Sequence, residues 1–159
     1  MPEMPRPAVA AGHLPEVSCR DRLTTDERVL ILQQCEILHS LDFDEIDRIA
    51  YLVEPEAHRA GELVIEDGAP ATYVYFVVSG AAEVRRGERV LARLGKGASV
   101  GEMALIDDSP RSAGVVMVEA GVLLRLHRDV FRDLVARHPE IYADLYRLLA
   151  ARVRNSPAE

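Results

Sequence analysis

The chain has 159 residues, and 48% of them are apolar, which is enough for one domain with a buried core. Its formal net charge is −7, and it carries no basic stripe of the kind that binds duplex DNA. No apolar run approaches the roughly eighteen residues of a membrane span, and no signal peptide is recognisable. Two cysteines, Cys19 and Cys35, make no disulfide framework, so we expect a reducing, cytoplasmic location.

The first 24 residues contain four prolines and are expected to form a flexible tail: Pro2, Pro5, Pro7 and Pro15. Thr24 and Glu27 have the spacing of a capping box, which predicts a helix beginning there. A second helix is expected from Asp42 until Pro55 ends it. Its apolar residues recur at helical spacing on one face: Ile46, Ile49, Ala50 and Val53.

Nine of the ten glycines fall between Gly61 and Gly121, as expected of turns between short strands. The pattern predicts strands over 73–78, 81–86, 88–94, 113–118 and 122–126. Roughly seven or eight strands at this spacing suggest a small antiparallel β-barrel or jelly roll. The predicted fold class is therefore mainly β with flanking helices (α+β), with two helices before the barrel and two after it.

After the barrel, one helix is predicted on the apolar face of Val130, Phe131, Leu134 and Val135. His138-Pro139 marks a break, with Pro139 in the first turn of a final helix that runs to about Val153. The apolar stripe on that helix is expected to be core or dimer surface: Ile141, Leu145, Leu148 and Leu149. We thus expect one domain over 25–154, followed by a polar tail over 155–159.

The segment 101–113 interrupts the strand pattern and has the chemistry of an anion cradle. A single helical turn over 102–106 after Gly101 would leave free N–H groups directed at an oxyanion. Arg111 can bind phosphate through a two-pronged contact, and Ser112 offers a hydroxyl beside it. Glu102 would repel a phosphate, but it can accept a hydrogen bond from a neutral hydroxyl such as that of a ribose. Phosphate plus sugar is therefore the expected ligand.

The stretches Gly101-Glu102-Met103-Ala104-Leu105 and Arg111-Ser112-Ala113 resemble the phosphate-binding cassette of the cyclic-nucleotide-binding domain family. This family occurs in catabolite-activator-type regulators, kinase regulatory subunits and nucleotide-gated channels, and the resemblance covers about 25–154. It implies that Glu102 binds the ribose 2′-hydroxyl and Arg111 the cyclic phosphate. Main-chain groups complete the implied cradle around Met103, Ala104, Ser112 and Ala113. Val100 and Gly114 depart from the family pattern, which often has an aromatic residue and Ser or Thr there.

Less specific interpretations remain for each residue. Arg111 could pair with Asp107 or Asp108, Glu102 could cap the short turn, and Ser112 could bond the local backbone. Other chemistries find less support. Gly95-Lys96-Gly97 lacks the spacing of a nucleoside-triphosphate loop, and the five histidines show no paired metal-ligand spacing. No nucleophile motif or placed carboxylate pair appears, so we expect neither an enzyme nor a metal site.

The sequence therefore predicts a regulatory module that binds cyclic AMP, with cyclic GMP also possible, and uses no cofactor. By resemblance, the helices over 128–153 reposition on binding, and Arg152 is a candidate contact to the base. A solvated arginine at a helix end is the alternative for Arg152. Expected partners are a protein effector or a second copy bound through the C-terminal helices, with no membrane and no DNA bound by this chain alone. A ligand-free scaffold, or the sensor part of a larger regulator, remains as an alternative function.

Overall fold

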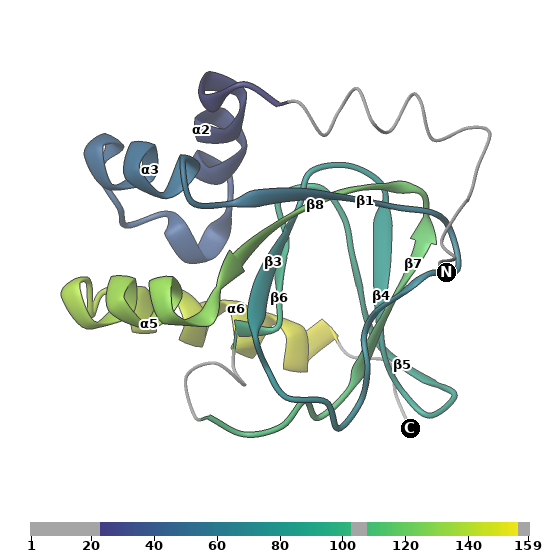
Figure 1. Ribbon diagram of the computed structural model, residues 1–159. Helices are drawn as coiled ribbons and strands as arrows, with labels where there is room; N and C mark the ends of the chain where they lie inside the picture. The colour runs from purple at the N-terminus through teal and green to yellow at the C-terminus, as the bar shows by residue number, and fades with distance from the viewer. Residues whose placement is uncertain (1–22, 103–107, 156–159) are drawn as a thin grey trace.

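A computed structural model describes residues 23–102 and 108–155. Two four-stranded antiparallel sheets form a jelly-roll barrel, and the helices gather on one side of it (Figure 1). One sheet has the order β1-β8-β3-β6 and the other the order β2-β7-β4-β5. The strands are β1 (Glu54–His58), β2 (Leu63–Ile65), β3 (Tyr73–Val77), β4 (Ala81–Arg86), β5 (Arg89–Leu94), β6 (Ser99–Val100), β7 (Gly114–Glu119) and β8 (Gly121–His127). The predicted fold class is confirmed.

Three of the eight strands described, β1, β2 and β6, were not located from the sequence. β1 is rich in charge and contains Pro55, and β6 has two residues, so neither shows an apolar alternation. The five predicted strands match β3, β4, β5, β7 and β8 to within one residue at each end. The pattern of apolar residues and glycines therefore located the strands that carry the apolar core and missed the shorter or more polar ones.

The N-terminal helices are α2 (Thr25–Gln33), the 3-10 turn η1 (Glu36–Leu38) and α3 (Phe43–Ala50). The predicted capping box is present: the amide of Glu27 donates to Thr24 Oγ1 at 3.1 Å, and the amide of Thr24 donates to Glu27 Oε1 at 2.8 Å. The second helix was predicted to begin at Asp42, and Asp42 is the residue that caps α3, with its side chain accepting from the amide of Glu45. The predicted end of this helix was wrong. The amides of Leu52 and Val53 both turn back to the carbonyl of Ile49, so the helix closes at Ala50 and Pro55 lies in β1.

The C-terminal helices are α5 (Arg128–Arg137) and α6 (Ile141–Asn155). The predicted break is present, because His138 leaves helical geometry with φ −131° and ψ 73°. Pro139 was expected inside the new helix, but it lies in the tight turn before Ile141, where its carbonyl accepts from the amide of Tyr142. α6 also runs two residues past the predicted end at Val153. Among the described residues, no helix is long and apolar enough to cross a bilayer.

The β1-β8-β3-β6 sheet separates two apolar cores. Phe76 of β3 packs in the core shared with the helices, whereas Tyr75 and Val77 pack in the core of the barrel. Side chains alternate between the two faces of a strand, so one strand contributes to both cores. The candidate site lies where β6 leaves this sheet.

Candidate functional site

The turn after β6 depends on a glycine. Gly101 has φ +91°, a left-handed conformation that favours glycine. A Cβ atom added there would lie 2.6 Å from Nη1 of Arg111. Gly101 therefore allows the backbone to turn and also leaves room for the guanidinium.

Arg111 is held in place by backbone on both sides of the site. Its own amide donates to the carbonyl of Ala69 at 2.9 Å, and its carbonyl accepts from the amide of Gly68 at 2.8 Å. Its guanidinium donates through Nη1 to the carbonyl of Gly101 at 2.6 Å and through Nη2 to that of Tyr73 at 2.5 Å. The charged group is thus held by the protein's own backbone, and a group positioned in this way lowers the entropic cost of binding an anion.

Burial of Arg111 strengthens the attraction of its guanidinium for an anion. Arg111 is only 7% exposed, and burial lowers its pKa, whereas Tyr75 and Glu102 act to raise it. An arginine remains protonated in proteins, so the site keeps a positive charge largely out of water. A partly desolvated cation attracts an anion more strongly than an exposed one does.

Glu102 is 1% exposed and points into the same site. Its Oε2 accepts a hydrogen bond from Nη1 of Arg152 at 3.3 Å. Its Oε1 is buried without a partner among the described residues, a costly state for a carboxylate oxygen. A ligand hydroxyl would supply the missing donor. The alternative role of Glu102 as a cap concerns residues 103–107, which lie outside the described part of the chain.

Arg152 reaches this site from α6, fifty positions along the chain from Glu102. Its Nη2 also donates to the carbonyl of Ser99 in β6. Its side chain is 22% exposed, so the structure does not support the alternative of a fully solvated arginine. The C-terminal helix is therefore tied to the site by a charge pair and a backbone contact.

These groups enclose a cavity of about 170 Å³. A second cavity of about 690 Å³ borders β5, the turn after it and α6, and Arg152 lines both. Polar and apolar residues both line the smaller cavity. Its lining residues are Ile65, Val84, Val100, Gly101, Glu102, Arg111, Ser112, Ala113, Val115 and Arg152.

The structure thus gathers six of the eight predicted site residues around one cavity: Gly101, Glu102, Arg111, Ser112, Ala113 and Arg152. Met103 and Ala104 lie outside the described residues. Sequence reasoning missed Arg86, whose Nε donates to the carbonyl of Ser112 at 3.0 Å, and the Ser99 carbonyl that holds Arg152. No local pattern marks either residue, because each acts on a partner 26 or 53 positions away.

The structure shows the surroundings of the two residues that depart from the family pattern, Val100 and Gly114. Val100 is 4% exposed and lines the cavity with its apolar side chain. Gly114 is buried against β2, and a Cβ atom there would lie 3.2 Å from the carbonyl oxygen of Ile65. A Ser or Thr at position 114 would therefore need the neighbouring backbone to shift.

The suggested pairing of Arg111 with Asp108 is not what the structure shows. The Asp108 carboxylate instead meets Arg128 and Arg132 of α5, while Asp107 falls outside the described residues. Within the described ranges, no three His, Cys, Asp or Glu side chains gather as metal ligands.

The chain is similar to several known proteins. A family model described as "Cyclic nucleotide-binding domain" matches residues 55–138. The cyclic AMP receptor protein of Thermus thermophilus is 34% identical, over 77% of this chain and 59% of its own length. Glutaminase 2 of Bradyrhizobium diazoefficiens is 41% identical, over 72% of this chain and 18% of its own length. A co-crystal structure of the regulatory domain of Toxoplasma gondii PKA with cAMP superimposes with a TM-score of 0.64 at 30% identity, covering 69% of this chain and 43% of that one. The chain spans less than two thirds of each of these relatives.

Proposed function

Because the chain belongs to the cyclic-nucleotide-binding domain family, we propose that it is a sensor for a cyclic nucleotide, with cyclic AMP the favoured ligand. The observation that carries this proposal is that a positioned, buried Arg111 and a buried Glu102 line one cavity, and that Oε1 of Glu102 has no hydrogen-bond partner among the described residues. The cation suits a cyclic phosphate, and the carboxylate suits a ribose hydroxyl beside it. The names of the Thermus receptor and of the Toxoplasma complex support cyclic AMP over cyclic GMP.

In this proposal, the cyclic phosphate binds Arg111 and the backbone of 101–104 and 112–113. The ribose 2′-hydroxyl donates to Oε1 of Glu102, while Arg152 keeps Oε2. The base lies toward α6, because Arg152 of that helix lines both the small cavity and the larger one. Arg152 then touches both the sugar-binding carboxylate and the base.

The proposed signal is a repositioning of 128–153. A ligand shifts a conformational equilibrium only through contacts that differ between two states. Arg152 provides such a contact, because it sits on α6 and bonds both β6 and Glu102. Binding would therefore bias how α6 rests on the barrel.

We propose that α6 also carries the partner surface. Tyr142, Tyr146 and Val153 are 52%, 74% and 77% exposed, and Leu149 lies between them at the spacing of a coiled-coil seam. Either a second copy or an effector helix would cover this stripe.

The family of the chain and the geometry of its site favour a regulatory role over catalysis by this chain. The buried free thiol of Cys35 suits a reducing compartment, so the cytoplasm remains our proposal.

Calorimetric titration with cyclic AMP, cyclic GMP and 5′-AMP at one salt concentration tests the ligand. We expect cyclic AMP to bind with a dissociation constant of about 1 μM or tighter, or about −8 kcal/mol. The phosphate of 5′-AMP is not closed into a ring with the ribose, so it has a different shape from the cyclic phosphate and should bind more weakly. Saturating cyclic AMP should also raise the melting temperature, because only the folded state binds it. No heat and no thermal shift at millimolar ligand would leave the ligand-free scaffold as the better interpretation.

A further inference from the structure

Glu45 of α3 is a charged hub outside the nucleotide site. Its side chain is 11% exposed and accepts from Arg48 Nε at 2.6 Å, within the same helix. It also contacts Nη1 of Arg137 at 2.7 Å and Nε2 of His138 at 2.9 Å, more than ninety positions away. One carboxylate therefore joins the N-terminal helices to the end of α5.

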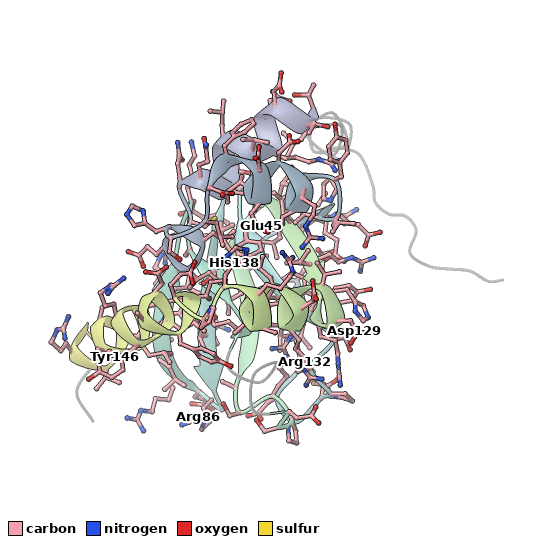
Figure 2. The ribbon with its side chains drawn as sticks, turned by 90° about the vertical axis from the view of Figure 1, so that its left-hand side faces the viewer. Glu45, Arg86, Asp129, Arg132, His138 and Tyr146 are labelled. Atoms are coloured by element: carbon pink, nitrogen blue, oxygen red, sulfur yellow. The ribbon has the colours of Figure 1, made fainter. Side chains whose placement is uncertain are left out.

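These distant partners lie at the break between the two C-terminal helices. Arg137 is the last residue of α5, and His138 is the first residue that leaves helical geometry. Figure 2 shows Glu45 and His138 between α3 and the junction of α5 with α6. The contact thus holds the point about which α6 would turn.

His138 faces carboxylates on both sides. Its Nε2 meets Glu45, and its Nδ1 lies 3.4 Å from Glu140 in the turn before α6. A neutral imidazole has one N–H, so only the imidazolium can donate to both carboxylates. The hydrogen bond to Glu45 accordingly raises the pKa of His138, although its partial burial opposes this, and Glu140 adds to the rise.

The other charged groups around the hub are Arg48, Arg137 and Asp133. Asp133 pairs with Arg137 at 3.1 Å and with Arg48 at 3.8 Å. Hydrogen bonds from Arg137, Arg48 and His138 hold the pKa of Glu45 far below its usual range. The hub therefore keeps its negative charge throughout the physiological pH range, and the proton on His138 is the part that can change.

We propose that Glu45 is a latch that fastens the α5–α6 break to α3 and thereby keeps Arg152 seated on Glu102. Arg152 lies eleven residues beyond Ile141, about 17 Å along the helix axis. A rotation of a few degrees at the break would displace its guanidinium by an ångström or more. The effect on α6 stands on the contacts of Glu45 alone, whereas the effect on nucleotide affinity rests on the proposed function.

The test is Glu45→Gln, which keeps the shape and removes the charge, compared with Glu83→Gln. Glu83 is a suitable control, because it is 16% exposed and pairs with Arg85 and Arg93 on the barrel, away from the break. Hydrogen exchange without ligand should become about fivefold faster or more across 141–153 in Glu45→Gln and stay unchanged there in Glu83→Gln. Equal exchange in both variants would overturn the latch, whatever the protein binds.

Two further measurements distinguish loss of the latch from overall destabilisation of the protein. If Glu45→Gln fails to fold, His138→Gln replaces it, because glutamine cannot carry the proton that serves both carboxylates. Wild-type exchange in α6, corrected for intrinsic rates, should speed up as pH rises through the pKa of His138, and His138→Gln should remove that dependence. Cyclic AMP affinity should fall about fivefold or more in Glu45→Gln. If the wild type binds no nucleotide but its exchange in α6 still depends on pH as described, the proposed function is refuted and the latch is supported.

Discussion

Asp108 accepts a hydrogen bond from Arg132, with 2.8 Å between Oδ1 and Nη2, and so joins the 101–113 segment to α5. Arg128 adds a contact at 3.4 Å to the same oxygen. Asp108 has φ +61°, a conformation that Asp and Asn tolerate better than most residues do. The segment proposed to bind phosphate is thus attached directly to a helix proposed to move.

Asp108→Asn should therefore reduce the response of α5 to cyclic AMP more than it reduces the stability of the protein. Asn keeps the backbone conformation but removes the charge, and an exposed ion pair contributes little to stability. We expect cyclic AMP to slow exchange at 101–113 as in the wild type, with a smaller change across 128–137. Glu119→Ala, which breaks an exposed pair with Arg93, serves as the control. An unaltered response of α5 in Asp108→Asn would show that the signal takes another route.

Arg111→Ala should cost about 2–5 kcal/mol of cyclic AMP binding, because a partly buried phosphate loses its counter-charge. Arg111→Lys should restore only part of this, since an ammonium cannot reproduce the planar guanidinium that reaches two carbonyls. Titration calorimetry of both variants, after circular dichroism has confirmed the fold, measures the losses. Wild-type affinity in Arg111→Ala would place the phosphate elsewhere.

Arg152→Ala should lower the free energy of unfolding by about 1–3 kcal/mol, because it strands the buried Glu102 carboxylate. Combining it with Glu102→Gln should recover part of that loss, since the stranded charge is then gone. Urea denaturation of the two single variants and the double variant gives the coupling. The control is Arg154→Ala, on an exposed position of the same helix. Additive losses would mean that Arg152 and Glu102 do not interact in solution.

Stability should fall as the pH rises above the ordinary pKa of histidine. His58 lies 2.8 Å from Glu56 and 3.0 Å from Glu62. Burial acts to lower the pKa of His58, but these two carboxylates raise it above its ordinary value of 6.5. A raised folded pKa stabilises the protein fully below about 6.5, and this contribution is lost as pH rises through the folded value. Urea midpoints between about pH 6 and 9 should fall more steeply in the wild type than in His58→Gln, and parallel curves would refute this role.

Tyr146→Glu should prevent self-association if α6 pairs with a second copy. Tyr146 is 74% exposed and visibly directed away from the protein on α6 (Figure 2), so a charge there disturbs a partner and not the fold. Sedimentation velocity across a concentration series would detect a dimer in the wild type and a monomer in the variant. Tyr51→Glu, at an exposed position after α3, is the matched control. A monomeric wild type at all concentrations would favour an effector helix as the partner.

The sequence predicted best those features that are contiguous in it. Arg111 and Glu102 could be proposed together because they stand in one short segment with its glycine, and the structure places both at one cavity. The capping box at Thr24 and the break at His138 are likewise local. Arg152 was predicted only as a candidate contact to the base. Its contacts with Glu102 and Ser99 were not predicted, because they depend on how α6 crosses β6. The hub at Glu45 was not predicted, since an acidic helix face usually meets water and nothing local shows that Arg137 and His138 cover it.

The division of β3 between two cores makes adjacent aromatic residues independent reporters. Tyr75 contributes to the barrel core and Phe76 to the helical core. The chain has five tyrosines and three phenylalanines, so fluorine labelling of either type yields a spectrum that can be assigned. A resonance from Tyr75 would follow the filling of the barrel, and one from Phe76 would follow the helices above the sheet. Their time courses after mixing with nucleotide would reveal whether the helices move before, with or after the arrival of the ligand.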